Sequence, residues 1–438
     1  MPSEPRILFR VDAGKNIGTG HLRRCLSIAR HLRRRGASVV FATRTSNPTI
    51  DHWLSDAGVT QVVLSGLAAS RVPHGQPWAP ADQEADAEDL LAQSGTPTWD
   101  TVVVDHYGLG IPWETALSDH THRLVVIDDL ANRAHHADLL VDHNWYGPNN
   151  HKRYKALVPP ETPLLLGPRY ALLDHSYATT RRSLPVRTPP KRVLVNFGGT
   201  DAGAQTTTAI DALLGFPDLL VDAVMGTPEA VEPSVAQRAT HPRVALHTNL
   251  PSLAPLLSKC DLAIGASGTA TWERLCLGVP ALVTTVHESQ SGVTRALAAA
   301  GVTTWLGTAS DVTLDDYRSA IAGVLAGNGP SPLPLVDGHG AARVALALLP
   351  GSGTDFDAQP PRWDDVATFT TSAPQAQQNT ESWRQRHADF VDFMGCAPRD
   401  IRLLRRGGVP VGVQYYGHTS SSARWLDPCI TLDVTAKG

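Results

Sequence analysis

One short segment near the start of the chain combines glycines, a hydroxyl side chain and a histidine where a helix is expected to begin. Glycine lets a ligand approach the backbone, and the first N–H groups of a helix are available to an anion. The positive helix end disfavours a protonated imidazole, so we expect His21 to be neutral near pH 7 and able to accept a proton from water. The segment predicts a site for a phosphate or a developing oxyanion, formed by Gly18, Thr19, Gly20 and His21. The alternative is a histidine that only caps the helix.

A second segment of this kind lies at residues 265–273. Ser267, Gly268 and Thr269 suit a diphosphate at a helix start, and Glu273 one turn later could accept both hydroxyls of a ribose. The alternative makes Glu273 a first-turn acid that serves the helix dipole. Thr269 precedes Glu273 by four positions and not by three, so the two do not form a capping box, which favours the ligand role.

Gly198 and Gly199 also follow an apolar run and precede a helical pattern. Their backbone could pack against a phosphate or a sugar, or they could form only a tight strand-to-helix turn. The sequence leaves both interpretations open.

Polar residues also follow three apolar runs in the first half of the chain. Asp105, His106 and Tyr107 follow the first run, residues 128–129 the second and residues 142–144 the third. Strand-end acids commonly hydrogen-bond to turns and to sugar hydroxyls, and no ligand spacing of the H-E-x-x-H kind occurs, so no metal is expected. We expect Asp105, His106 and Tyr107 to contact substrate.

The elements that position these residues are short strands that alternate with helices. Residues 7–11 form an apolar run, residues 22–32 keep the spacing of a helix with one buried face, and residues 38–43 form the next run, so together they predict a βαβ unit. Further runs at 102–104, 124–127 and 139–141 predict a parallel sheet. The pattern restarts at residue 192 and repeats at 262–264 and 281–286. Two similar α/β halves predict a ligand cleft where the carboxyl ends of their strands meet.

Length and composition limit the class of protein. The chain has 438 residues, of which 42% are hydrophobic and 18% charged, with a net charge of −4. It therefore has no overall positive field that would attract nucleic acid, and no nucleic-acid partner is expected. No run of about 18 apolar residues and no signal peptide is apparent, which predicts a cytoplasmic protein without a membrane span. The five cysteines have no C-x-x-C pair and are expected to be reduced core residues. The sequence contains no heptad pattern, so it predicts no particular oligomeric state.

The expected domains follow from these patterns. They are a first α/β domain at 1–178, a linker at 179–191, a second α/β domain at 192–350, a flexible connector at 351–380 and a short β-rich fragment at 381–438. Residues 401–404, 411–416 and 429–434 are the expected strands of that fragment.

In its order of motifs the chain resembles the nucleotide-sugar hydrolases of pseudaminic acid biosynthesis and the SpsG-type proteins of spore-coat polysaccharide synthesis. The resemblance covers most of residues 6–348 and rests on the motifs at 10–12, 17–26, 104–109, 127–131, 166–173, 196–201 and 266–274. It implies two Rossmann-like domains in a GT-B-type arrangement like that of MurG. The second domain would hold the nucleotide and the first would face the sugar.

The same resemblance implies the reaction and the site. The family hydrolyses UDP-2,4-diacetamido-2,4,6-trideoxy-β-L-altropyranose to UDP and the free sugar, without a metal or other cofactor, and His21 matches its catalytic histidine. The resemblance adds Asp12, Arg169, Tyr170 and Gln290 to the expected substrate contacts. Relatives often have Asp-Asn-Gln at a position where this chain has His287-Glu-Ser-Gln290. Only Gln290 matches the motif of the family.

The tail resembles the central strands of a GNAT acetyltransferase. The sequence stops at Gly438, where the loop for the pyrophosphate of acetyl-CoA would begin, so no acetyl transfer is expected. Two other functions compete with hydrolysis. One is a glycosyltransferase that passes the sugar from UDP to an acceptor, and the other is a nucleotide-sugar binding or scaffold protein.

Overall fold

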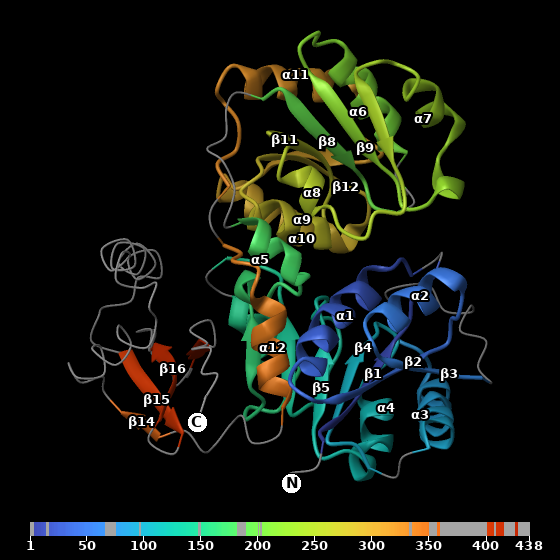
Figure 1. The fold of residues 1–438 in the computed structure, drawn as a ribbon, viewed down its shortest axis with the longest axis vertical. Helices are drawn as coiled ribbons and strands as arrows, with labels where there is room; N and C mark the ends of the chain where they lie inside the picture. The colour runs from blue at the N-terminus through green and yellow to red at the C-terminus, as the bar shows by residue number, and fades with distance from the viewer. Residues whose placement is uncertain are drawn as a thin grey trace, which may run out of the picture. The chain divides into compact units, whose positions relative to one another are not determined.

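The structure, a computed structural model, describes residues 4–14, 17–65, 76–95, 98–147, 150–181, 190–199, 201, 204–332 and 335–349, and in the tail only the backbone of four strands. The chain divides into two compact units, Met1–Leu348 and Leu349–Gly438, which are described separately. The first unit contains two parallel β-sheets with helices packed around them (Figure 1).

The first sheet has the strand order β3-β2-β1-β4-β5-β6-β7, with every pair parallel. Its central strands are buried on both faces, as expected where helices cover both sides of a parallel sheet. The predicted parallel sheet is therefore confirmed. The strands are β1 (Arg6–Val11), β2 (Ser38–Thr43), β3 (Thr60–Val63), β4 (Thr101–Asp105), β5 (Leu124–Ile127), β6 (Leu139–Asp142) and β7 (Leu164–Leu166).

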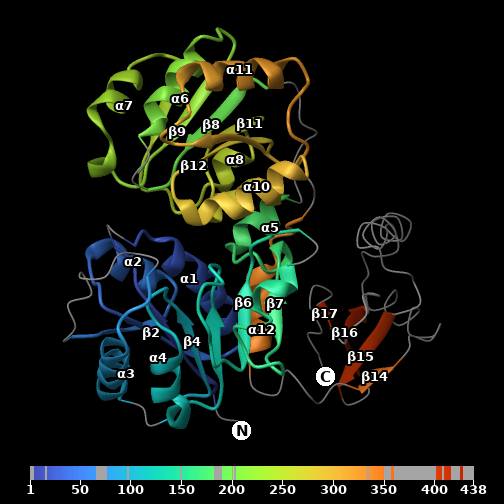
Figure 2. The same ribbon diagram turned by 180° about the vertical axis from the view of Figure 1, so that it is seen from behind.

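Helices connect these strands and cover the sheet (Figure 2). The predicted helix after β1 is confirmed as α1, because Leu22, Cys25, Ala29 and Leu32 lie on its buried side. The helical segments of this half are α1 (Gly20–Arg33), α2 (Pro48–Asp56), α3 (Pro80–Ser94), α4 (Ile111–Ala116), η2 (Ser118–His120), η3 (Asn150–Tyr154), η4 (Pro168–Tyr170) and α5 (His175–Arg181).

The second sheet has the order β10-β9-β8-β11-β12-β13 and is also parallel throughout. Its strands are β8 (Arg192–Asn196), β9 (Leu220–Val224), β10 (Val244–His247), β11 (Leu262–Ala266), β12 (Ala281–Thr285) and β13 (Thr304–Thr308). Gly265 lets β11 approach β8 closely, because a Cβ atom at this position would lie 2.0 Å from the carbonyl oxygen of Asn196.

The helical segments of the second half are α6 (Gln205–Leu214), η5 (Pro228–Ala230), α7 (Pro233–Arg238), α8 (Ala254–Leu257), α9 (Thr269–Cys276), η6 (Glu288–Gln290), α10 (Ser291–Ala299), α11 (Leu314–Leu325) and α12 (Gly340–Leu348). Buried Cys260 and Cys276 are free thiols, as is Cys25 of the first half.

The two halves exchange helices. Helix α12 follows the second half in sequence but packs against α1 and η4 of the first (Figure 1), and the Thr101 hydroxyl donates to the Leu348 carbonyl over 3.0 Å. Conversely, α5 packs against α8 and α9 of the second half. The structure thus differs from the expected boundaries at 178 and 350, because an apolar helix face does not reveal which sheet it will cover. Of the expected linker, residues 182–189 lie outside the described residues.

The second unit contains an antiparallel sheet of order β14-β15-β16-β17. These strands are β14 (Asp357–Gln359), β15 (Ile401–Arg406), β16 (Val409–Tyr415) and β17 (Trp425–Asp427). The pairing of β15 with β16 confirms the expected two strands around a turn, whereas the third strand expected at 429–434 lies outside the described residues. Among the described residues, no helix has both the length and the apolar character needed to cross a bilayer.

Candidate functional site

His21 lies in the first turn of α1, opposite the carboxyl end of β4. Its Nδ1 is 2.6 Å from Oδ1 of Asp105, the last residue of that strand. A nitrogen this close to an ionised carboxylate carries the proton, so in the neutral ring the Nε2 atom holds the lone pair. The His21 side chain is 10% exposed and Asp105 is fully buried. The arrangement orients the imidazole and gives it the tautomer of a general base.

Arg24, one turn further along α1, joins two carboxylates. Its Nε donates to Oδ2 of Asp105 over 2.6 Å, and its Nη1 donates to Oδ2 of Asp129 over 2.7 Å. Burial alone would raise the pKa of both carboxyls, but the Arg24 guanidinium, together with His21 and the other neighbouring groups, outweighs burial, so each pKa lies well below its usual range. Asp105 therefore stays ionised beneath His21.

Tyr107 completes the group from the loop after β4. Its hydroxyl donates to Oδ1 of Asp129 over 2.7 Å, and its ring meets His21 edge-on with 4.6 Å between centroids. Burial and the Asp129 carboxylate raise the pKa of Tyr107 well above its usual value. The phenol therefore remains a hydrogen-bond donor at neutral pH.

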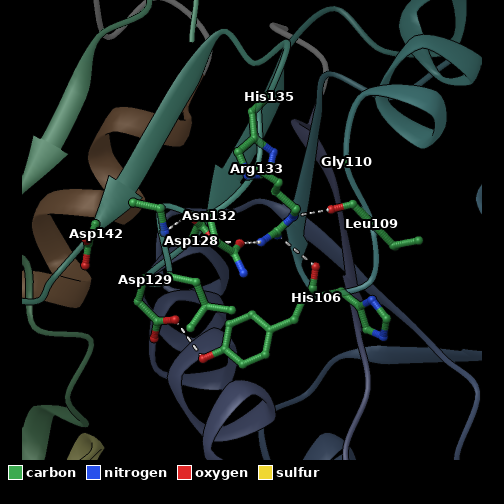
Figure 3. A network of polar contacts seen from close by, with 12 residues as sticks. His106, Leu109, Gly110, Asp128, Asp129, Asn132, Arg133, His135 and Asp142 are labelled. Atoms are coloured by element: carbon green, nitrogen blue, oxygen red, sulfur yellow. Dashed lines mark hydrogen bonds and ion pairs between the residues drawn. The ribbon is translucent and has the colours of Figure 1, made fainter. Parts of the chain in front are cut away.

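Arg133 fixes the loops that carry Tyr107 and Asp129 (Figure 3). Its Nη1 donates to Oδ1 of Asp128 over 2.9 Å, its Nε to the Leu109 carbonyl over 2.9 Å and its Nη2 to the His106 carbonyl over 3.2 Å. One guanidinium thus joins the turn after β5 to the loop after β4, which holds Tyr107 and Asp129 in position relative to each other.

Asp12 and His106 face a different set of residues. Asp12 accepts a hydrogen bond from Arg10 Nη2 over 2.9 Å, and His106 Nε2 lies 3.4 Å from the same carboxylate. Arg10 also donates to Asp86 over 2.8 Å. Burial favours protonation of Asp12, but Arg10 and His106 together outweigh it and lower the pKa of Asp12. These two predicted substrate contacts are engaged in a buried ion network, and their role as substrate contacts stays a prediction.

The start of α9 lies opposite the start of α1. A Cβ atom at Gly20 would lie 3.6 Å from the Thr269 hydroxyl, and Gly268 before it has φ 121°. Ser267 hydrogen-bonds to Thr294, and Gln290 accepts from the Val286 backbone N–H over 3.0 Å. The structure thus brings the two predicted glycine-rich helix starts together, so that N–H groups from both halves face one region.

Glu273 lies beside Tyr177 of α5. Burial raises the pKa of Glu273, and Tyr177 and Arg23 oppose that shift. Arg23 itself donates to the Leu250 carbonyl over 3.2 Å, which joins α1 to the second half. The Glu273 carboxylate is therefore at the junction of the two halves. Its predicted contact with a ribose stays a prediction.

The remaining predicted contacts are Arg169, Tyr170, Gly198 and Gly199. Arg169 and Tyr170 belong to η4, which packs on α12, and the Arg169 carbonyl accepts from Arg343 over 2.7 Å. Gly198 and Gly199 are exposed after β8, and the Gly199 carbonyl accepts from the Gly226 N–H over 2.9 Å. That bond joins the segments that follow β8 and β9, and it decides neither the turn nor the ligand interpretation.

Arg24 and Asp129 were absent from the predicted site. The signal for Arg24 was a charged residue three positions after His21, and therefore on the same buried helix face. Asp129 lay in one of the acidic strand ends, but the sequence could not show which of Asp128 and Asp129 points to His21. Among the described residues, no group of three or more His, Cys, Asp or Glu side chains is arranged to hold a metal ion.

No known protein-family profile matches the sequence. The chain is 21% identical over 295 residues to an uncharacterised protein of Methanocaldococcus jannaschii, covering 65% of this chain and 56% of that protein. It is 26% identical over 207 residues to the spore coat polysaccharide biosynthesis protein SpsG of Bacillus subtilis, covering 45% and 61%.

A third relative is the UDP-2,4-diacetamido-2,4,6-trideoxy-β-L-altropyranose hydrolase of Campylobacter jejuni, 22% identical over 172 residues that cover 39% of this chain and 53% of the hydrolase. The matches thus span between about half and three fifths of the length of these curated relatives.

Solved structures show the same architecture. UGT89C1 of Arabidopsis thaliana, solved with UDP-L-rhamnose, matches with a TM-score of 0.55 at 12% identity, over 79% of this chain and 99% of that one. The MnaA–UDP structure from S. aureus matches with a TM-score of 0.52 at 12% identity, over 81% and 100%. The chain therefore has an α/β fold with two Rossmann-like domains in a GT-B-type arrangement, followed by a short β-rich C-terminal fragment.

Proposed function

We propose that this protein hydrolyses a UDP-linked diacetamido-trideoxy sugar, UDP-2,4-diacetamido-2,4,6-trideoxy-β-L-altropyranose or a close relative, to UDP and the free sugar. The observation that carries the proposal is the pairing of His21 with Asp105 over 2.6 Å, at a helix start that faces the start of α9. A base and an anion site on opposite sides of one region are the two groups that hydrolysis of a nucleotide sugar needs.

In the proposed reaction His21 activates water. Nε2 takes one proton from a water molecule while the water oxygen forms a bond to the anomeric carbon. The bond between that carbon and the diphosphate oxygen breaks, and UDP leaves with the electron pair. Asp105 stabilises the imidazolium that forms, because its carboxylate is held ionised by Arg24. The proton then passes to solvent.

The charge that develops on the leaving diphosphate would be met by the start of α9. Gly268 allows the backbone to approach a phosphate, and the first N–H groups of the helix carry partial positive charge. Glu273, at the junction of the halves, would accept the ribose hydroxyls. Because diphosphate is a good leaving group, no acid is needed on its side of the bond.

The choice of sugar rests on the Campylobacter jejuni relative, whose name states this substrate, together with the similarity to SpsG. The relevant match includes less than half of this chain, so the sugar is the part of the proposal that most needs a test. A glycosyltransferase would use the same groups differently, because a histidine that deprotonates water can also deprotonate an acceptor hydroxyl.

The test is UDP release from a panel of UDP-linked amino sugars, with EDTA and without an acceptor. We expect release by the wild type that falls by roughly 10²-fold or more in His21→Ala. His31→Ala is the matched control, because His31 is another buried histidine of α1 in its last turn, and its activity should stay near the wild-type value.

Other outcomes would replace the proposal. Release that requires an added acceptor would make the protein a glycosyltransferase. UDP binding without release under either condition would make it a nucleotide-sugar binding protein. Release that EDTA abolishes would contradict a reaction without metal.

A further inference from the structure

His143 is a buried histidine that the proposed reaction does not use. It directly follows β6, and β6 pairs with β5, which ends just before Asp128 and Asp129. The side chains that follow β4, β5 and β6 meet at one edge of a parallel sheet, so His143 lies at the same edge as Asp105 and Asp129. Arg24, Asp129, Asp105 and His21 all act electrostatically on its ring.

The His143 imidazole has a polar atom without a partner. The residue is 3% exposed, and its Nδ1 is buried without a hydrogen-bond partner. An unsatisfied buried polar atom costs on the order of 1–3 kcal/mol, which is unusual in a folded protein unless a ligand or water satisfies it. Burial, and secondarily Arg24, lowers the pKa of His143 to about 4, so the ring is neutral at pH 7.

The surroundings of His143 belong to both halves of the first unit. Its ring meets Trp272 of α9 edge-on with 6.0 Å between centroids. Trp145 and Tyr146, just after it, pack against the apolar core of the second half. On the other side the neighbouring Asp129 carboxylate is 14% exposed. His143 therefore lies between the expected nucleotide side and the His21 side, where the sugar of a UDP-sugar would be.

We propose that His143 recognises an acetamido substituent of the bound sugar through one hydrogen bond at Nδ1, with the methyl group of that substituent against the neighbouring aromatic rings. A neutral imidazole suits an amide better than a phosphate, because it adds no charge and the nearby Asp129 carboxylate repels anions. This inference deepens the proposed function and rests on it. His143 is a specificity residue in this view, and the base remains His21.

The test measures binding to the full chain by titration calorimetry with UDP, UDP-glucose and UDP-N-acetylglucosamine. The two sugars differ in a hydroxyl and an acetamido group on one carbon. We expect the wild type to bind the acetamido sugar about 5- to 10-fold more tightly, as one neutral hydrogen bond allows. His143→Leu should abolish this preference while the affinity for UDP alone stays unchanged.

Two amide variants make the test specific to Nδ1. The amide of Asn lies near the position of Nδ1, whereas the amide of Gln reaches toward the position of Nε2, so His143→Asn should keep more of the preference than His143→Gln. This comparison also decides the matter if His143→Leu does not fold. His31→Asn is the control, because His31 is a similarly buried histidine at the far end of α1.

A preference that survives in His143→Leu, or equal loss in the Asn and Gln variants, would overturn the role of His143. So would a wild type that binds UDP but does not distinguish the two sugars. A wild type that does not bind UDP would instead overturn the proposed function, so the two failures are distinguishable.

Discussion

The Nδ1 atom of His21 and the Oδ1 atom of Asp105 lie 2.6 Å apart, although 84 positions separate the residues in sequence. The strand β4 lies beside β1 in the sheet, and this pairing places the end of β4 under the first turn of α1. The carboxylate therefore sets the tautomer of the imidazole, and the proposed base depends on a partner that comes from a different βα unit.

Asp105→Asn should reduce kcat strongly with little change in KM. The amide keeps the size of the side chain but removes the charge that fixes the tautomer and stabilises the imidazolium, so we expect a loss of about 10²- to 10⁴-fold. Steady-state UDP release measures it. Asp174→Asn serves as the control, since Asp174 pairs with Arg30 at a half-exposed position. A kcat within threefold of the wild type would show that the pair has no catalytic role.

Arg24→Met should destabilise the fold by about 3–5 kcal/mol, because it leaves two buried carboxylates without their cation. Urea unfolding of the variant and of Arg30→Met provides the comparison. Arg30 bonds to the exposed Asp56, so its loss should cost about 1 kcal/mol or less. Similar losses in both variants would contradict the structural role given to Arg24.

The same variant should change the pH profile of activity. Arg24 lowers the pKa of Asp105, so the carboxyl stays ionised well below neutral pH in the wild type. Without the guanidinium the pKa of Asp105 rises, and protonation of this group reaches less acidic pH. The acid limb of kcat should therefore move to higher pH in Arg24→Met, and an unchanged limb would contradict the electrostatic role given to Arg24.

His31 should make the protein less stable in acid. Burial and the nearby Arg35 and Arg34 lower the pKa of His31 to about 4, against 6.5 for the free side chain. The unfolded chain then binds a proton below pH 6.5 that the folded chain refuses, so stability falls as the pH drops from 6.5 to 4, by up to about 3 kcal/mol. In His31→Gln this contribution is absent. The difference in unfolding free energy between the two proteins, measured at pH 7, 5 and 4, should follow this curve, and a constant difference would refute it.

Gly265→Ala should destabilise the second half by about 3 kcal/mol or more, because the new Cβ atom would lie 2.0 Å from the Asn196 carbonyl oxygen and the strands would have to separate. Gly323→Ala is the matched change inside α11, where nothing lies within 4 Å of the new atom. Helix propensity predicts a gain of about 1 kcal/mol there. Thermal unfolding of the two variants should therefore shift in opposite directions.

Apolar runs predicted the inner strands of both parallel sheets, except for β9. Apolar runs such as residues 38–43 and 124–127 coincide with β2 and β5, because a strand covered on both faces must be apolar throughout. The strands β3, β7, β9, β10 and β13 were missed, and all of them except β9 are only partly buried. The helix starts at His21 and Thr269 were recognisable from the glycines before them, which are a local signal.

The pairing of side chains was harder to predict because it depends on direction. Asp105, His106 and Tyr107 were expected to act together, yet His106 faces Asp12 while Asp105 and Tyr107 face His21 and Asp129. Successive side chains at a strand end point to opposite sides, and this alternation separates position 106 from its neighbours. Arg24 and His143 were missed because their importance depends on contacts across the sheet, which no local pattern contains.

The helix exchange sets an order for folding during synthesis. The first sheet is translated before the second, but the side of α1 that packs against α12 is covered only when α12, ending at Leu348, has left the ribosome. Residues 192–325 can form the second sheet with its own helices before that point. The helix α5, which also packs on this half, has been synthesised by then. The half of the molecule that is synthesised first is thus the half that is completed last, and a nascent chain stalled before residue 340 would expose the part of α1 that α12 covers.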